Sequence, residues 1–347
     1  MSEPIESATQ CIDSAKKGVA WLLENQNGDG SWKRLPNPPF DAYYRAAWTL
    51  TLMGEAGAAN RTLDYVKAQF LTPEGDFLPR ENGWYKTVHY PYPNAILVYG
   101  AQKAGRYDLV APGLRFLLGQ QDPIYGGFYM TLAEPGQRAI SNTLSTSMAG
   151  VALLAAGQLD AARRAGDWHC RLVEMQPDLE HLFYTATKPD GSLRTDFAPE
   201  ESRWHMVDTK VEGTQCWYSI GLPFAFAVQL AEATGEKRYA ELAQALFNFQ
   251  LRCPSPWDGP SSGKAAWACS MLYRQTGERQ YRDIALRVAG NFISRQTPEG
   301  WFKGWLYVPP KPGDENPFLT VRQFESTLEF CQWLGLIGGN LLARDPK

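Results

Sequence analysis

The chain has 347 residues, of which 44% are hydrophobic and 20% are charged, so it carries enough apolar side chains to bury a large core. Lysine and arginine number 34 against 37 acidic residues, and this net charge of −3 gives a nucleic-acid or anionic-membrane partner no electrostatic support. The longest apolar stretches are too short to span a bilayer, and the N-terminus lacks the basic-then-apolar order of a signal peptide. These features predict a folded cytoplasmic protein that binds a small molecule, with no nucleic-acid or membrane partner.

The six cysteines are scattered along the chain, and none forms a Cys-x-x-Cys pair. That spacing fits neither a disulfide scaffold nor a structural zinc site. We therefore expect most of them to be buried as small apolar residues, and we expect no metal and no cofactor.

One pattern occurs six times in chain order: an amphipathic helix, a loop with glycine, proline or aspartate and an aromatic residue, a second and more apolar helix, and a glycine turn. The glycine turns follow the last apolar residues of a helix, where a left-handed cap costs least without a Cβ atom. The second helices of the six pairs are predicted at residues 41–53, 93–104, 139–156, 212–233, 264–276 and 321–336.

The repeats are evenly spaced except between the fourth and the fifth, where an insertion around 176–211 carries prolines that break any long helix. Six sequential helical hairpins without recognisable strands predict an all-α fold, an (α/α)6 toroid with six outer helices, six inner helices and a central cavity. An open solenoid of helix pairs is the alternative. Closure is favoured because no terminal hairpin has the polar face of a cap, and residues 1–347 are then a single domain.

The segment 16–32, KKGVAWLLENQNGDGSW, resembles the QW motif of the terpenoid cyclase and protein prenyltransferase superfamily. Weaker copies cover 121–128 and 295–301. The resemblance implies an α/α toroid in which the glutamine bonds loop backbone and the tryptophan stacks over the helix end. The residues that match the motif in order are Lys17, Gly18, Trp21, Leu22, Leu23, Gln26, Gly30 and Trp32.

The catalytic motifs of that superfamily are missing. The chain has no Asp-x-Asp-Asp run, no Asp-x-Cys with a distant histidine, and no Cys-His pair with a separate cysteine, since His169-Cys170 has the reverse order. Squalene cyclisation, protein prenylation and lanthionine formation are therefore disfavoured. The toroid also resembles that of six-hairpin glycosidases, sugar epimerases and polysaccharide lyases, whose late repeats read much like residues 233–250.

In such a toroid the N-terminal ends of the inner helices share one face, and their free backbone N–H groups favour negative charge nearby. The candidate acids and bases at these ends are Asp41, His89, Asp208, Glu212 and Glu325. The candidate substrate-binding residues are Tyr43, Tyr44, Arg45, Tyr90, Tyr92, Asn142, Gln215, Trp217, Trp267, Trp305 and Arg322.

Each candidate acid or base also has a structural interpretation. Asp41 is either a helix cap or an acid, and His89 is either a catalytic group or a packed side chain. Asp208 and Glu212, four residues apart, would raise one another's pKa on a helical face, or would simply face solvent at a helix start. Glu325 belongs either to a buried ion pair or to a catalytic site.

These patterns support three hypotheses. The first is a metal-independent acid/base enzyme, a cyclase, isomerase or lyase, acting on an isoprenoid, polyketide or similar partly apolar molecule in the central cavity. The second is a carbohydrate-active hydrolase, lyase or epimerase. The third is a toroid that binds a ligand or acts as a scaffold without catalysis. The many aromatic residues near the loops fit either stacking on sugars or stabilisation of a cationic intermediate.

Overall fold

The computed structural model of the protein describes residues 7–33, 35, 39–77, 89–134, 136–259, 261–304 and 317–345. The chain divides into two compact units, which are described separately. Unit 1 consists of Met1–Leu78, Ile96–Gly113 and Cys269–Lys347, and unit 2 of Pro79–Ala95 and Leu114–Ala268. That residues 1–347 form a single domain stays a prediction.

Six helical hairpins follow one another along the chain, as the repeat predicts. The first helices of the hairpins are α1 (Ala8–Glu24), α3 (Ala56–Gln69), α5 (Tyr107–Gly119), α7 (Leu159–Glu174), α10 (Lys237–Arg252) and α12 (Arg279–Ile293). The second helices are α2 (Ala46–Leu52), α4 (Pro91–Lys103), α6 (Thr143–Ala155), α9 (Tyr218–Thr234), α11 (Gly263–Thr276) and α13 (Pro317–Arg344).

The two kinds of helix differ in burial in the way that their apolar patterns predict. Helix α6 is buried at every position from Thr143 to Leu153, because it has protein on all sides. Helix α7 buries one face only, at the spacing of a helical repeat. The alternation of one-sided and fully buried helices is therefore confirmed.

The expectation of no strands is wrong for the insertion. Two short antiparallel ladders join β1 to β3 and β2 to β4, the second pairing Leu182 with Asp208. Prolines and glycines keep this segment from forming long helices, and its extended pieces satisfy their backbone groups by pairing. The short elements are β1 (Ser141–Asn142), β2 (Leu182–Tyr184), β3 (Ala186–Thr187), η3 (Pro199–Glu201), α8 (Ser202–His205) and β4 (Met206–Asp208).

The predicted helix start at residue 212 is also wrong, because α9 begins at Tyr218. The preceding residues form a turn in which Asp208 Oδ1 accepts a hydrogen bond from the Lys210 N–H at 2.8 Å. The Gln215 side chain donates to the Asp208 carbonyl oxygen and accepts from the Asp208 N–H, both at 2.8 Å. These local bonds replace the first helical turn, so Asp208 and Glu212 share no helical face.

The second helix of the first hairpin begins later than predicted as well. Asp41 lies in a short 3-10 turn, η1 (Phe40–Ala42), and α2 starts at Ala46. The chain turns tightly here because the Tyr43 N–H donates to the Phe40 carbonyl oxygen at 2.9 Å. Asp41 therefore precedes the helix by more than one turn.

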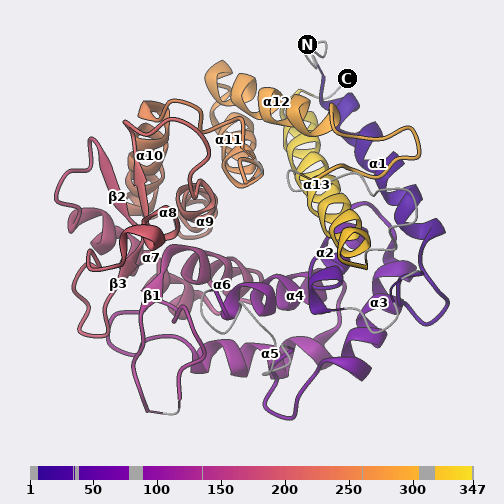
Figure 1. Ribbon diagram of the computed structural model, residues 1–347, viewed down its shortest axis with the longest axis horizontal. Helices are drawn as coiled ribbons and strands as arrows, with labels where there is room; N and C mark the ends of the chain where they lie inside the picture. The colour runs from indigo at the N-terminus through magenta and orange to yellow at the C-terminus, as the bar shows by residue number, and fades with distance from the viewer. Residues whose placement is uncertain are drawn as a thin grey trace. The chain divides into compact units, whose positions relative to one another are not determined.

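In unit 1 the first and the last hairpins of the chain pack against each other, with α1 beside α13 (Figure 1). Gln296, just after α12, donates through Nε2 to the Ser14 carbonyl oxygen of α1 at 2.8 Å. The Ser14 hydroxyl donates back to Gln296 Oε1 at 2.8 Å. The chain ends are thus joined by side-chain bonds as well as by apolar packing.

The glutamines of the three QW-like segments make the same kind of link. Gln26 donates to the Ala58 carbonyl oxygen of α3 at 3.1 Å, and Gln121 donates to the Ala161 carbonyl oxygen of α7 at 2.9 Å. Gln121 also bonds its own loop, as predicted, through the Gly126 carbonyl oxygen at 2.9 Å. Each glutamine therefore ties its hairpin to the first helix of another hairpin, a link that the motif alone did not reveal.

Another loop with the same backbone bond lies inside the insertion. The Lys188 N–H donates to the Ser192 carbonyl oxygen at 2.8 Å, just as the Asn27 N–H donates to the Ser31 carbonyl oxygen at 2.8 Å. In both loops a glycine with positive φ follows, Gly191 at 85° and Gly30 at 88°. The sequence analysis overlooked this copy because the adjoining strand pairs interrupt the repeat.

Five of the six cysteines are buried and Cys170 is half-buried, all with free thiols, as expected. Burial raises the pKa of the Cys11 thiol to about 12, so it stays protonated and unreactive. Within the described ranges, no helix has the length and apolar character needed to cross a membrane.

Candidate functional site

The predicted site residues fall into both units. Asp41, Tyr43, Tyr44, Arg45, Arg322 and Glu325 lie in unit 1, and the others lie in unit 2 apart from Trp305, which is outside the described residues. Each unit brings one group of polar side chains together. We call Asp41, Arg45, Arg322, Glu325 and Glu329 the carboxylate cluster. We call His89, Asn142, His205, Tyr218 and Lys264 the histidine cluster.

The carboxylate cluster is built on one face of α13. Residues 322, 325 and 329 are spaced by three and four, so they stand one above the other on the helix. Arg322 Nη1 lies 2.6 Å from Glu325 Oε2. Arg45, at the start of α2, reaches Glu329 Oε1 at 3.3 Å, and the Trp333 indole N–H donates to the same oxygen at 3.2 Å. Two helices therefore hold the cluster.

Burial raises the pKa of Glu325 to about 7, against the lowering effect of the Arg322 guanidinium, while the Asp41 and Glu329 carboxylates raise it further and Arg45 lowers it. The cluster contains three carboxyl groups and two guanidinium groups, so a proton on Glu325 balances its charge. Only 15% of the Glu325 side chain is exposed. A carboxyl group with this pKa exchanges a proton readily near neutral pH.

The aromatic residues beside this cluster are packed in the core. Tyr43 is fully buried, its hydroxyl accepts a hydrogen bond from the Trp32 N–H at 3.1 Å, and its ring stacks on Trp32. Burial raises the pKa of Tyr43, so its hydroxyl keeps its proton. Tyr44 lies under the Arg45 guanidinium, 5.1 Å from ring centre to Cζ. Tyr43 is thus part of the buried core of unit 1, and its contact with a substrate stays a prediction.

The histidine cluster surrounds the residue that precedes α4. His89 has a φ of 65°, a backbone conformation that residues other than glycine adopt rarely, and it is 7% exposed. Its Nδ1 atom lies 2.9 Å from the amide nitrogen of Asn142, the residue that caps α6. The ring of Tyr218, the first residue of α9, meets the imidazole edge-on, with 5.7 Å between ring centres.

The electrostatics of this cluster keep His89 neutral. Burial, together with the nearby His205 and Lys264, lowers the pKa of His89 to about 3. Both neighbours are buried, with 5% of His205 and 4% of Lys264 exposed. His205 in turn lies 3.3 Å from the Arg194 guanidinium through its Nε2 atom. His89 is therefore an uncharged imidazole in a positively charged surrounding.

Among the remaining predicted residues of unit 2, Tyr92 is linked to this cluster, because its N–H donates to the His89 carbonyl oxygen at 3.0 Å and its side chain acts electrostatically on Tyr218. Tyr90 is buried against Phe116, and Trp217 and Trp267 are buried to 1% and 3% exposure. The Gln215 side-chain amide donates a hydrogen bond to Asp208 within the turn before α9. Glu212, in the same turn, is exposed.

Glu329 and Tyr218 belong to the clusters and were missed. Glu329 lies four residues after Glu325, so the helical spacing gave a signal that could have found it. Tyr218 directly follows the predicted Trp217. It was missed because the helix was predicted to begin at residue 212, which put Tyr218 inside the helix and not at its first turn. Among the described residues, no group of three or more histidine, cysteine, aspartate or glutamate side chains is arranged to hold a metal ion.

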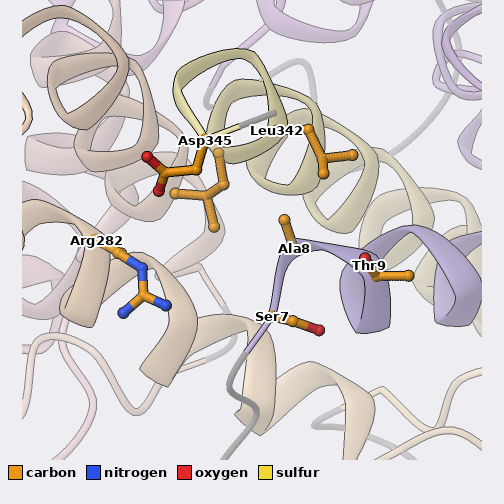
Figure 2. Close-up of a pocket in the computed structure, with 7 residues that line it drawn as sticks. Ser7, Ala8, Thr9, Arg282, Leu342 and Asp345 are labelled. Atoms are coloured by element: carbon orange, nitrogen blue, oxygen red, sulfur yellow. The ribbon is translucent and has the colours of Figure 1, made fainter. Parts of the chain in front are cut away.

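A further pocket lies in unit 1, between the beginning of α1 and the end of α13, apart from the carboxylate cluster (Figure 2). Its volume is about 160 Å³, and it is faced by Arg282 of α12 and by Asp345, the residue that follows α13. The Tyr273 hydroxyl donates to Asp345 Oδ2 at 2.6 Å. Its lining residues are Ser7, Ala8, Thr9, Arg282, Leu341, Leu342 and Asp345. None of the predicted site residues lines this pocket.

No family model matches the chain, and no curated protein matches it. Solved structures do. A GH76 α-mannanase of Bacteroides thetaiotaomicron is 14% identical with a TM-score of 0.65, and the match covers 95% of this chain and 96% of that one. A D-mannose isomerase is 14% identical with a TM-score of 0.66, covering 95% and 99%. The type II terpene cyclase MstE of Scytonema is 14% identical with a TM-score of 0.58, covering 97% and 98%.

These likenesses show the fold. The chain is an all-α protein with the α/α toroid architecture that the mannanases, the isomerase and the terpene cyclase share, which confirms the predicted fold class. The terpenoid cyclases are one of several kinds of protein with this architecture that the chain resembles.

Proposed function

We propose that the protein is an enzyme that moves a proton on a carbohydrate, as an isomerase or an epimerase, with Glu325 as the acid and base. The observation that carries this proposal is the state of Glu325 in the carboxylate cluster. A buried carboxyl group at 2.6 Å from Arg322 with a pKa of about 7 is present in both its acidic and its basic form at neutral pH.

The comparisons support a carbohydrate as the substrate. Mannanases and a D-mannose isomerase are among the proteins that share the fold. A mannanase variant of Salegentibacter in which two adjacent aspartates are replaced is described as inactive, and this chain has no two adjacent aspartates anywhere in its sequence. Proton transfer of the isomerase kind is therefore favoured over the hydrolysis that the mannanases carry out.

The proposed step breaks the C–H bond on the carbon next to a sugar carbonyl group. The proton goes to the Glu325 carboxylate, and the electron pair forms the C=C bond of an enediolate. Return of the proton to the adjacent carbon, with one hydroxyl proton moving to the former carbonyl oxygen, gives the isomeric sugar. Return to the opposite face of the same carbon gives the epimer.

Two neighbours of Glu325 fit this step. The Arg322 guanidinium, in contact with Glu325, stabilises negative charge on the carboxylate and on an enediolate oxygen. The Asp41 carboxylate raises the pKa of Glu325 and so favours its protonated form when the proton must be held. The opposite effects of Arg322 and Asp41 keep the protonated and the ionised forms of Glu325 close in free energy near neutral pH.

The test is solvent deuterium exchange. The enzyme is incubated in D2O with D-mannose, D-glucose, D-galactose and D-fructose, and deuterium at carbon is followed by NMR. We expect exchange with at least one sugar, and we expect Glu325→Gln to slow it by about 10²- to 10⁴-fold, because the proton carrier is gone. Exchange that is unchanged in this variant contradicts the role of Glu325. Cleavage of α-1,6-mannotriose without exchange into any sugar contradicts the isomerase proposal.

Glu329→Gln is the matched comparison, because Glu329 lies one turn away on the same face of α13 and is paired with Arg45. This substitution removes a negative neighbour, so the pKa of Glu325 falls. We expect the exchange reaction to persist with its pH profile displaced to lower pH. Equal losses in the two variants would assign the effect to damage of the cluster as a whole.

A second candidate function is proton-initiated cyclisation of an isoprenoid, as in MstE. It is favoured by an aromatic cluster at Phe324, the residue before Glu325 in α13, since Trp21 and Trp32 pack on Phe324 with 4.9 and 5.0 Å between ring centres. Aromatic faces stabilise carbocations. Incubation with geranylgeranyl dihydroxybenzoate and analysis for a cyclic product tests it, and a cyclic product that Glu325→Gln abolishes would replace the carbohydrate proposal.

A further inference from the structure

His89 combines three features that rarely occur together. Its backbone has a φ of 65°, and it is the only non-glycine residue with a positive φ in the described parts of the chain. Its side chain is more than nine-tenths buried. Of its two ring nitrogens only Nδ1 makes a hydrogen bond to a described residue, so Nε2 is left without a partner among them. Backbone strain of this kind is concentrated at functional sites.

The bonds of Asn142 determine which ring nitrogen carries the proton. Asn142 caps α6, and its Oδ1 atom accepts from the Ser145 backbone N–H at 2.9 Å. A backbone N–H can only donate, which places the amide oxygen toward Ser145 and the amide nitrogen toward His89. That nitrogen can also only donate, so His89 Nδ1 accepts at 2.9 Å. The neutral imidazole therefore carries its proton on Nε2.

Further polar groups lie on the helices that contribute to this cluster. Lys264 is buried to 4% exposure on the first turn of α11, within electrostatic range of His89. Thr143 and Ser145, on the first turn of α6, are fully buried, and their hydroxyl oxygens have no hydrogen-bond partner among the described residues. Buried polar groups that are unsatisfied within the protein indicate a place for a ligand or water. A ligand that offers acceptor oxygens would satisfy them.

We propose that the histidine cluster is a second binding site, in which His89 Nε2–H donates a hydrogen bond to a carboxylate oxygen of a small organic acid and Asn142 is the positioning residue that keeps this proton on Nε2. A carboxylate supplies acceptors only, which matches a site of donors beside a lysine. The neutral histidine is suited to this role, because an imidazole N–H can serve as a fixed donor to an oxygen that bears negative charge. The site does not depend on Glu325 or on the proposed function.

The tautomer can be measured without any assay of activity. The chain has 4 histidines, so nitrogen–proton correlation NMR of protein labelled at histidine resolves each ring. We expect His89 to show Nε2–H in the wild type, and a spectrum that shows Nδ1–H or a mixture of the two forms overturns the proposal. The signals are assigned with His89→Gln.

Asn142→Asp separates the two tasks of Asn142. Aspartate caps a helix as well as asparagine does, but its carboxylate accepts, so it draws the His89 proton to Nδ1. We expect the tautomer to switch in this variant, and persistence of Nε2–H overturns the role of Asn142. If Asn142→Asp fails to fold, Asn142→Ser keeps the cap and removes the contact with His89, and we then expect a mixture of tautomers.

His169 is the internal control. It is buried to 2% exposure, and its Nε2 atom lies 2.9 Å from Ser147 Oγ, whose own proton is donated to the Thr143 carbonyl oxygen at 2.7 Å. His169 therefore also carries Nε2–H, and this N–H already has a partner inside the protein, the Ser147 hydroxyl. Its signal should stay unchanged in the Asn142 variants.

The ligand class is tested by titration with sodium D-gluconate. We expect gluconate to shift the His89 Nε2–H signal and to leave the His169 signal in place, and we expect Asn142→Asp to weaken binding by at least about tenfold through loss of a charge-assisted donor. The Glu325→Gln variant should bind gluconate as the wild type does, which keeps this result separate from the proposed function. No shift with gluconate, an equal shift of His169, or a shift with D-mannose alone overturns the proposal.

Discussion

The carboxylate cluster of unit 1 and the histidine cluster of unit 2 both bury titratable side chains, and in both burial shifts the pKa of one of them in favour of its neutral form. In unit 1 the neutral form of Glu325 is the protonated one, and burial raises its pKa to about 7. In unit 2 the neutral form of His89 is the deprotonated one, and burial lowers its pKa to about 3. The same desolvation thus acts with opposite sign on an acid and on a base.

The clusters also differ in what holds them together. Glu325 and Glu329 are paired with the guanidinium groups of Arg322 and Arg45. His89 and His169 are held by neutral hydrogen bonds to Asn142 and Ser147. Charge pairs and neutral bonds respond differently when one partner is removed, because an unpaired buried charge costs more than an unpaired amide or hydroxyl.

The largest expected effect follows from breaking a charge pair in unit 1. Arg45→Met removes the guanidinium group that pairs with the Glu329 carboxylate at 3.3 Å, so we expect the free energy of unfolding to fall by about 3 kcal/mol. Urea denaturation at pH 7 measures it. Lys67→Met is the control, because the Lys67–Asp108 pair is also in unit 1 at 2.8 Å but is largely exposed. Equal losses in the two variants would show that burial of the pair is unimportant.

The second effect concerns the pH dependence of Glu325. Its pKa is raised in the folded state, so its contribution to stability is complete below the unfolded value of about 4.5 and is lost as the pH rises through about 7. Between pH 5 and pH 7 this loss amounts to about 2 kcal/mol. We therefore expect Glu325→Gln to gain about 2 kcal/mol relative to the wild type over that range in urea denaturation.

The control for this measurement is Glu174→Gln, which removes an exposed carboxylate at the end of α7. It should follow the wild type at both pH values. A gap between Glu325→Gln and the wild type that stays constant from pH 5 to pH 7 would mean that Glu325 does not titrate in this range.

The third effect concerns unit 2, where stability is lost as the pH falls and not as it rises. Burial lowers the pKa of His169 to about 3, so its contribution is complete above the unfolded value of about 6.5 and is lost as the pH falls toward 3. At pH 5 the loss is about 2 kcal/mol. We expect His169→Gln to be less sensitive to acid by this amount. His181→Gln, at an exposed histidine paired with Asp178, should behave as the wild type does.

The parts of these clusters that the sequence predicted are those set by local patterns. Helical spacing placed Glu325 with Arg322 on one face of α13, and proline-bracketed aromatic residues placed His89 before α4. The six hairpins followed from the same periodicity, and the fold is confirmed. The catalytic and binding roles of these residues stay predictions.

The errors come from contacts between residues distant in sequence or from side chains that replace backbone bonds. The β2–β4 pair joins residues 182–184 to 206–208, a pairing that no local pattern specifies. The false helix start at 212 arose because Gln215 and Asp208 satisfy the backbone that a helix would otherwise use. The ion pair of Arg45 with Glu329 depends on the packing of α2 against α13, so the sequence alone did not predict it.

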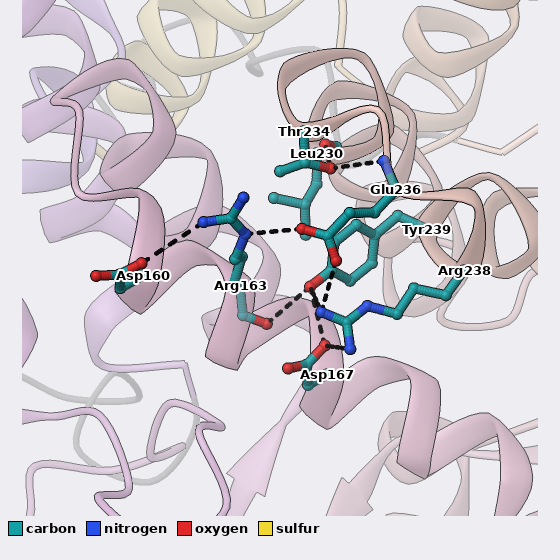
Figure 3. A network of polar contacts seen from close by, with 8 residues as sticks. All are labelled: Asp160, Arg163, Asp167, Leu230, Thr234, Glu236, Arg238 and Tyr239. Carbon is teal, nitrogen blue, oxygen red and sulfur yellow. Dashed lines mark hydrogen bonds and ion pairs between the residues drawn. The ribbon is translucent and has the colours of Figure 1, made fainter.

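The smallest expected effect lies on the surface of unit 2, at a partly exposed charge pair. Arg163 of α7 and Glu236 before α10 form an ion pair of 2.7 Å within a network that also contains Asp167, Arg238 and Tyr239 (Figure 3). The pair is half exposed, so water and salt screen it, and the network offers Glu236 a second partner in Arg238 at 2.7 Å. We expect Arg163→Ala to leave the melting temperature unchanged within error at physiological salt. A fall in the free energy of unfolding as large as the one expected for Arg45→Met would mean that pair geometry, and not burial, determines the energy of these charge pairs.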